Sequence, residues 1–147
     1  MLVGADGRDT LRGRAGDDVL LGDGGNDYLK GLTGRDIIYA GAGTDSTFGN
    51  GGDDLIIGGT LTPDDELTVL EHLTGDLRTE WLSSRTYEQR AENIRGQYLR
   101  GSNHSNQNVF GDNNADSLAG GNNADWFFSQ LGSDLLDDET DEIVEPF

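Results

Sequence analysis

Six aspartates recur every nine residues near the start of the chain, and each follows a glycine by two positions. The aspartates are Asp9, Asp18, Asp27, Asp36, Asp45 and Asp54, and the glycines are Gly7, Gly16, Gly25, Gly34, Gly43 and Gly52. Carboxylates and backbone carbonyls are the hard oxygen ligands that Ca²⁺ prefers. Glycine lets a turn aim several carbonyls at one point, because it reaches backbone angles that a Cβ would forbid. The spacing therefore indicates a repeated turn that could bind a hard divalent cation.

These residues belong to six consecutive nine-residue units between Gly4 and Ile57, with glycine at the fourth place and aspartate at the sixth. The eighth place is aliphatic in five units, and such side chains can face inward between two sheets. The five are Leu11, Leu20, Leu29, Ile38 and Ile56. Thr47 takes this place in the fifth unit, where we expect it to weaken the core, although Phe48 beside it can compensate from the outer face.

The units resemble the G-G-x-G-x-D-x-U-x nonapeptide of RTX proteins, a calcium-binding parallel β-roll motif. The resemblance implies that six residues of each unit form a turn and three a short strand, and that alternate units stack on the same edge. It also implies that Ca²⁺ lies between stacked turns, held by the sixth-place carboxylate and by carbonyls from the first five places. The second-place residues implied in this way are Ala5, Arg14, Asp23, Leu32, Gly41 and Asn50. The alternative is a metal-free glycine-rich solenoid or a disordered polar repeat, which gives the aspartate column no packing role.

The composition limits the classes of partner. The 147 residues carry a formal net charge of −18, and only 33% are hydrophobic, so the chain is close to the disordered regime unless cations neutralise it. About four sandwiched sites would bring roughly eight positive charges. So acidic a chain is not suited to bind nucleic acid or anionic lipid, because both need a basic protein surface. The absence of cysteine excludes disulfides and thiolate metal sites.

Residues 60–101 interrupt the repeats with helical spacing. A first helix is expected to begin at Thr62 and Pro63, and Gly75 leaves two shorter helices open. Its apolar face would comprise Leu67, Leu70, Leu73, Leu77 and Trp81. A second helix is expected from about Thr86 to Arg95, and its apolar side would comprise Tyr87, Ala91 and Ile94.

This segment also holds much of the positive charge, in Arg78, Arg85, Arg90, Arg95 and Arg100. The arginines could dock onto the acidic repeats, or they could form a solvated helix face with local ion pairs. We expect the helical unit to pack on the end or the side of the roll, since the exposed ends of repeat arrays need capping.

The period of nine returns in a degenerate form over residues 111–137, where Asp116, Asp125 and Asp134 keep the sixth place. Asn114 and Asn123 replace the fourth-place glycine, and asparagine tolerates left-handed angles. Because only the first and third of these units could stack on one another, we expect about one well-formed calcium site here. The second unit could bind if it stacks on the end of the first block or on another copy. The alternative is a metal-free remnant that serves as a cap.

The sequence thus predicts a mainly β fold: a parallel β-roll (β-solenoid) of nonapeptide repeats with an inserted helical segment and a short degenerate second repeat block. We divide the chain into a calcium-binding roll (1–59), a helical insert or cap (60–101), degenerate repeats (102–137) and an acidic tail (138–147). The first complete unit already begins at Gly4, so we expect the chain to be the C-terminal part of a larger protein.

The function we predict is a calcium-binding module whose folding is driven by about four or more Ca²⁺ ions between stacked turns. The resemblance implies export and extracellular folding of a larger bacterial protein, at the cell surface or in secreted form. The acidic tail resembles export signals read by type I secretion machinery, although a plain acidic tail fits equally well. The alternative function is a calcium-stabilised adhesion or assembly module, in which self-association is expected.

No catalytic activity is predicted. The chain has no cysteine, no H-E-x-x-H motif and no phosphate-binding loop, and His72 and His104 are too isolated to form a catalytic or metal site. The many acidic pairs are accounted for as calcium ligands and solvated turn residues.

Overall fold

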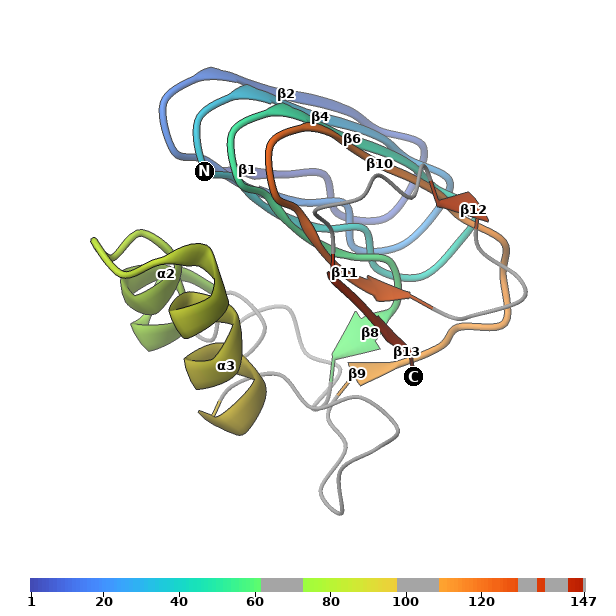
Figure 1. Cartoon of the computed structure of the whole chain (residues 1–147). Coiled ribbons are helices and arrows are strands. Elements are labelled where there is room, and N and C mark those ends of the chain that lie inside the picture. The colour runs from blue at the N-terminus through green and yellow to red at the C-terminus, as the bar shows by residue number, and fades with distance from the viewer. Residues whose placement is uncertain (62–72, 98–108, 130–134, 137–142, 147) are drawn as a thin grey trace.

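The protein has a mainly β fold in which parallel strands form two sheets, and in the described part of the chain two helices lie against one of them (Figure 1). The computed structural model describes residues 1–61, 73–97, 109–129, 135–136 and 143–146. The prediction of a mainly β chain with an inserted helical segment is therefore confirmed at this level.

Successive units of the repeat contribute strands to the two sheets in turn. The six-stranded sheet has the order β1 (Leu2–Val3), β3 (Val19–Leu21), β5 (Ile37–Tyr39), β7 (Leu55–Ile57), β11 (Trp126–Ser129) and β13 (Ile143–Pro146). The five-stranded sheet has the order β12 (Leu135–Leu136), β10 (Ser117–Asn122), β6 (Ser46–Gly51), β4 (Tyr28–Thr33) and β2 (Thr10–Ala15). The short strands β8 (Thr60–Leu61) and β9 (Val109–Phe110) pair antiparallel beside them.

Throughout the first block, residues that pair between neighbouring strands are two nine-residue units apart in the sequence. Leu20 pairs with Ile38, so the offset is 38 − 20 = 18 residues. At the junction with the second block, Thr47 pairs with Leu118 and Ile56 with Phe127, an offset of 118 − 47 = 71 residues. The chain therefore leaves the stack after β7, passes through 71 − 18 = 53 additional residues, and resumes the stack at β10.

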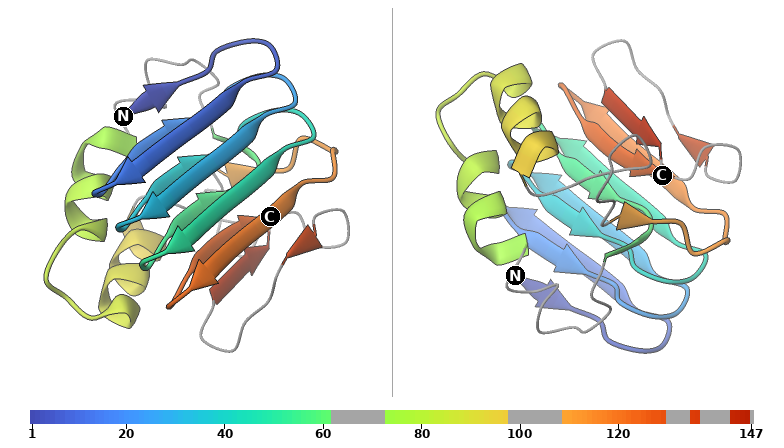
Figure 2. Two further views of the ribbon diagram at one scale, coloured as in Figure 1. Left: turned by 90° about the horizontal axis from the view of Figure 1, so that it is seen from above. Right: turned by 90° about the horizontal axis from the view of Figure 1, so that it is seen from below.

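The second block consequently continues the first (Figure 2). The expectation that its units stack only on one another is wrong: β10 lies between β6 and β12, and β11 lies between β7 and β13. The open alternative, stacking of this block on the end of the first, is the arrangement found. Only pairing across the insert could decide this, because the spacing within each block is nine in either case.

The space between the two sheets is filled by eighth-place side chains from both. Leu11, Leu29 and Leu118 come from the five-stranded sheet, and the cluster is completed by Leu20, Ile38, Ala40, Ile56 and Phe127. This confirms that the eighth place faces inward. One aliphatic layer between two sheets is a thin core, since roughly 0.8 kcal/mol is gained per buried methylene group.

A second apolar cluster lies on the outer face of the six-stranded sheet, where α2 (Asp76–Trp81) and α3 (Tyr87–Gln97) cover it. From the helical segment it takes Leu73, Leu77, Trp81, Ala91 and Ile94. From the sheet it takes Val19, Leu21, Ile37, Tyr39, Leu55, Ile57, Trp126 and Phe128. The prediction that the helices pack on the repeats is confirmed, and they pack on a side.

The helix boundaries also follow the sequence closely. The break predicted at Gly75 is confirmed, because this residue is the N-cap of α2. The second helix, predicted from about Thr86 to Arg95, runs from Tyr87 to Gln97 with Ala91 and Ile94 buried. The predicted start of the first helix at Thr62, together with Leu67 and Leu70, lies outside the described residues.

Thr47 is fully buried between the sheets, and its hydroxyl has no hydrogen-bond partner in the described part of the chain. A buried unsatisfied hydroxyl costs about 1–3 kcal/mol. We therefore expect Thr47→Val to raise the free energy of unfolding by about 1 kcal/mol, measured by urea denaturation in saturating calcium. Thr10→Val, at an exposed strand position, is the matched control. An equal change in both variants would contradict this account of Thr47.

Candidate metal centre

Stacking arranges the sixth-place aspartates in two columns, one at each end of the strands. The first column contains Asp9, Asp27, Asp45 and Asp116, and the second contains Asp18, Asp36, Asp54 and Asp125. In both columns the backbone N–H of each of the first three aspartates donates to Oδ1 of the aspartate on the next turn, at 2.7–2.8 Å. The structure thus brings together eight of the nine predicted carboxylates. Asp134 lies outside the described residues.

The other carboxylate oxygen of the central aspartates is buried without a hydrogen-bond partner among the described residues. This holds for Oδ2 of Asp27, Asp36, Asp45 and Asp54, and the exposed fractions of these residues are 4, 0, 1 and 0%. A buried ionised oxygen is costly unless it is paired or coordinates a metal. The turns therefore fit a cation, because it would ligate these unpaired carboxylate oxygens.

The turn backbone has the same unusual conformation in each unit of the first block. The second-place residues all have positive φ, at 69° for Ala5, 88° for Arg14, 70° for Asp23, 88° for Leu32, 97° for Gly41 and 82° for Asn50. The fourth-place glycines also have positive φ, between 104° and 136°. A left-handed conformation costs a residue with a Cβ roughly 1–2 kcal/mol. Five of the second-place residues carry that strain, so contacts made by the stacked turns must offset it.

The fourth-place glycines are required by close approach between turns. A Cβ on Gly25 would lie 1.5 Å from the carbonyl oxygen of Gly7, and one on Gly43 would lie 1.7 Å from that of Gly25. The N–H of Gly7 also donates to the carbonyl of Gly24 at 2.7 Å. The backbones of successive turns are therefore in direct contact, which brings their carbonyl oxygens close to the aspartate columns.

The two described turns of the second block differ from each other. Gly121 and Asn123 have positive φ at the second and fourth places, so this turn keeps the pattern. In the preceding turn the positive φ is at the third place, at Asn113. Its second-place Asp112 instead accepts a hydrogen bond from the N–H of Gly43 at 2.5 Å. The sixth-place carboxylates of both turns nevertheless join the columns.

Burial raises the pKa of the central aspartates. Desolvation is the main cause, and it raises the pKa of Asp36 and Asp45 to about 6 and that of Asp54 to about 9. The amide hydrogen bonds of the ladder lower the pKa and offset part of this effect, while neighbouring carboxylates in the same column raise it further. The pKa of Asp27 is also raised, mainly by burial. Without a cation, the interior of each column therefore favours protonation.

The possible donors are oxygens only. Within the described residues, no group of three or more His, Cys, Asp or Glu side chains converges on one point. A metal site in these turns would therefore combine sixth-place carboxylates with backbone carbonyls. Such an all-oxygen donor set suits Ca²⁺, which takes six to eight oxygen ligands in flexible geometry.

Stacked nonapeptide turns that present carboxylates and carbonyls define a class of repeat proteins with oxygen-donor metal sites. A family model described as the RTX calcium-binding nonapeptide repeat (4 copies) matches the chain in three segments, residues 1–29, 21–56 and 105–136. These segments cover more than half of the chain, which therefore belongs to the RTX calcium-binding repeat family. RTX repeats bind Ca²⁺, and they are found in secreted bacterial proteins. Neither the curated proteins nor the solved structures compared with this chain gave a match.

Arginines of the insert contact the turns, as one of the two sequence alternatives predicted, but the sequence did not identify their partners in the turns. Of the arginines expected to dock or to form local pairs, Arg90 pairs with Asp53 of the sixth unit at 2.5 Å. Arg85 instead forms a local ion pair with Glu80 at 2.6 Å. Docking onto the repeats is therefore found for Arg90, and local pairing is found for Arg85. A signal existed in the fifth places of the second column, where Asp17, Arg35 and Asp53 are all charged.

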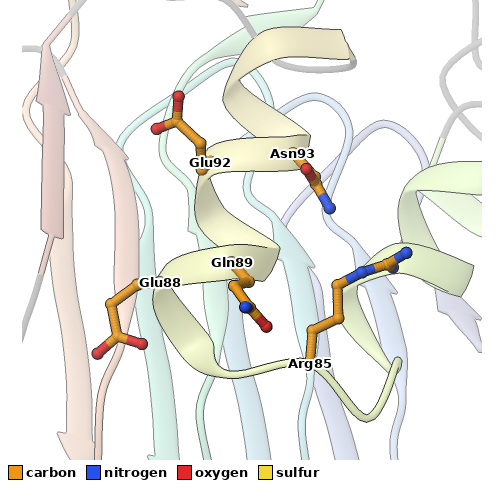
Figure 3. A pocket seen from close by; sticks show the side chains of 5 residues that line it. All are labelled: Arg85, Glu88, Gln89, Glu92 and Asn93. Carbon is orange, nitrogen blue, oxygen red and sulfur yellow. The ribbon is translucent and has the colours of Figure 1, made fainter.

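The helical insert also has a pocket of its own (Figure 3). It is lined by Arg85, Glu88, Gln89, Glu92 and Asn93. Four of the five belong to α3, Arg85 lies two residues before it, and none belongs to a nonapeptide unit.

Among the described residues, no helix is long and apolar enough to cross a membrane.

We expect the calcium-free chain to lose stability as the pH rises from about 4 to 9. An aspartate whose pKa is higher in the folded than in the unfolded chain binds protons more tightly when folded, so the free energy of unfolding falls as the pH rises. For Asp36 and Asp45 the free energy of unfolding starts to fall near pH 3.8 and stops falling near pH 6. For Asp54 the fall continues to about pH 9. Thermal melting in a chelator across this pH range measures the effect.

The control is the double variant Asp36→Asn and Asp45→Asn, which cannot ionise at these positions and should show a smaller fall between pH 4 and 6. A calcium-free chain that becomes more stable over that interval would contradict the raised pKa values. Saturating calcium should reduce the pH dependence above pH 6, because metal ligation requires the deprotonated carboxylates.

Proposed function

We propose that this chain is a calcium-binding module in which Ca²⁺ bound between stacked turns drives folding into a parallel β-roll. The observation that carries the proposal is the pair of aspartate columns, in which one carboxylate oxygen ties adjacent turns together and the other is buried without a protein partner at Asp27, Asp36, Asp45 and Asp54. In a chain of net charge −18, the carboxylates within each column repel one another unless cations neutralise them.

The proposed ligands are the sixth-place carboxylates of both columns and the backbone carbonyls of the first five places of each unit. They include the carbonyls of the second- and fourth-place residues, and Asp134 as a further carboxylate. Calcium supplies positive charge and coordination that the described side chains do not provide. We propose about four or more ions. The division into a roll (1–59), an insert (60–101), degenerate repeats (102–137) and a tail (138–147) remains a prediction.

The energetics favour a switch between unfolded and folded states. Extracellular calcium modules have dissociation constants on the order of 10⁻⁴ to 10⁻³ M. At a tenfold excess over that value, one site adds about 1.4 kcal/mol to the free energy of unfolding. Four independent sites would add roughly 5–6 kcal/mol, comparable with the whole stability of a small domain. The chain would therefore be unfolded where calcium is scarce and folded where it is plentiful.

This switch fits a role in export. A chain that stays unfolded in the low-calcium cytosol and folds outside the cell is suited to passage through a secretion channel. We propose that the module is secreted or displayed at a bacterial cell surface, that type I secretion machinery is its transport partner, and that it has no catalytic activity of its own.

Circular dichroism during a calcium titration tests the folding proposal. At neutral pH we expect a largely unfolded spectrum in chelator, a cooperative gain of β signal in millimolar calcium, and heat of calcium uptake by calorimetry. Asp27→Asn together with Asp36→Asn should raise the calcium midpoint about tenfold or more, since a ligand is lost from each column. Asp76→Asn, at an exposed position at the start of α2, is the control for loss of a carboxylate outside the columns. A folded spectrum in chelator that calcium leaves unchanged would refute the proposal.

The second candidate is calcium-stabilised adhesion or assembly. The observation that favours it is the outer face of the five-stranded sheet, which carries the Tyr28 and Phe48 rings with centroids 5.4 Å apart and Leu135 with 71% of its surface exposed. Apolar side chains on an open sheet face can support association between proteins. Sedimentation velocity with and without calcium separates the two functions: a calcium-folded monomer favours the folding role, and calcium-dependent oligomers favour assembly.

A further inference from the structure

The helical insert is bonded to the turns of the second aspartate column. The guanidinium of Arg78 in α2 donates to the carbonyl oxygen of Asp17 at 3.2 Å. The guanidinium of Arg35, in the fourth unit, donates in the opposite direction to the carbonyl oxygen of Ser83 at 3.0 Å. Asp17 and Arg35 occupy the same place two units apart, so these bonds span adjacent stacked turns.

Two further contacts continue this series along the stack. Arg90 of α3 pairs with the carboxylate of Asp53 at 2.5 Å, and the side chain of Arg90 is only 3% exposed. Its guanidinium also lies 5.0 Å from the centroid of the Trp81 ring. The hydroxyl of Tyr87 donates to the carbonyl oxygen of Asp125 at 2.5 Å. The insert thus contacts four turns of one column, on both sides of the 53-residue excursion.

Both helices lie at the edge where β2, β4, β6 and β10 turn into β3, β5, β7 and β11 (Figure 2). These are the turns of the second column, whereas the first column lies at the other end of the same strands. The four contacts can form together only if the four turns are stacked, because they come from a helical pair whose own spacing is fixed by Trp81, Ala91 and Ile94 in the outer cluster.

We propose that α2 and α3 act as a clasp on the second column: docking of the helices and calcium binding in that column stabilise each other. Calcium binding in the first column is coupled less strongly to docking of the helices. This inference rests on the proposed calcium function. Coupling between two binding events is reciprocal, and it commonly amounts to a 5- to 150-fold change in affinity. Tyr87 and Arg90 are then positioning residues. Tyr87 binds the backbone carbonyl of Asp125 and Arg90 binds the fifth-place carboxylate of Asp53, and neither group is among the proposed calcium ligands.

The chain contains its own reporter of docking. Its two tryptophans, Trp81 and Trp126, are fully buried in the outer cluster with their ring centroids 6.3 Å apart. Tryptophan fluorescence therefore reports burial of the helices against the six-stranded sheet. Circular dichroism in the same titration reports formation of the strands.

The first experiment compares Asp36→Asn with Asp45→Asn. The two residues are matched in burial, at 0 and 1% exposed, and both have aspartates above and below them, but Asp36 is in the second column and Asp45 in the first. We expect Asp36→Asn to raise the calcium midpoint of the tryptophan signal at least fivefold more than Asp45→Asn does. Equal shifts would overturn the clasp.

The second experiment tests the reverse direction and remains informative if either Asn variant fails to fold. Arg90→Met keeps the apolar stem and removes the charge, and Lys30→Met, on the outer face of the other sheet, is the control. NMR of ¹⁵N-glycine-labelled full-length chain follows calcium binding at Gly16, Gly34 and Gly52 of the second column. It also follows Gly7, Gly25 and Gly43 of the first column.

We expect Arg90→Met to raise the calcium midpoint of the second-column glycines about tenfold relative to the first. Lys30→Met should change neither column selectively. A shift of both columns by the same factor in Arg90→Met would overturn the clasp while leaving the proposed function intact. A wild-type chain whose circular dichroism and glycine signals do not respond to calcium would overturn the proposed function, and with it the coupling.

Discussion

The ladder of buried carboxylates is the interaction on which the rest of this structure depends. Each rung joins the amide of one sixth-place aspartate to Oδ1 of the next, so neighbouring turns are held at the spacing of adjacent strands. The same ladder concentrates negative charge where water is excluded, and the raised pKa values of Asp36, Asp45 and Asp54 are the measure of that cost. The group that bridges the stacked turns is thus also the group whose charge is costly to bury.

Two apolar layers of different kinds complete the stability of the fold. The layer between the sheets holds one eighth-place side chain per strand, and at Thr47 it includes a buried hydroxyl. The layer outside the six-stranded sheet is larger, because Trp81, Trp126 and Phe128 belong to it. A long excursion from a repeat is tolerated thermodynamically, since the entropy of loop closure grows only slowly with loop length. Here the excursion returns to the stack as a helical cover for an otherwise exposed apolar face.

The amino-acid sequence predicts this structure best where a local rule applies. The nine-residue period predicted the strands and the inward face, and Gly75 predicted the break before α2. Positive φ at Leu32 and Arg14 could not be read from propensity, because residues of these types rarely adopt it; only their place in the repeat indicated the turn. The bonds from the insert to Asp17, Asp53 and Asp125 could not be predicted either, since they depend on where two helices dock.

The sequence by itself determined the repeat, the turn that places carboxylates beside carbonyls, and the preference of that donor set for a hard cation, because each follows from residue type at fixed spacing. Tertiary structure alone decided that the second block extends the first, and that one aspartate column lies under the helices while the other lies at the far end of the strands. The physical reason is that pairing across 53 additional residues, and docking of a helical pair, are non-local contacts for which a nine-residue period carries no information.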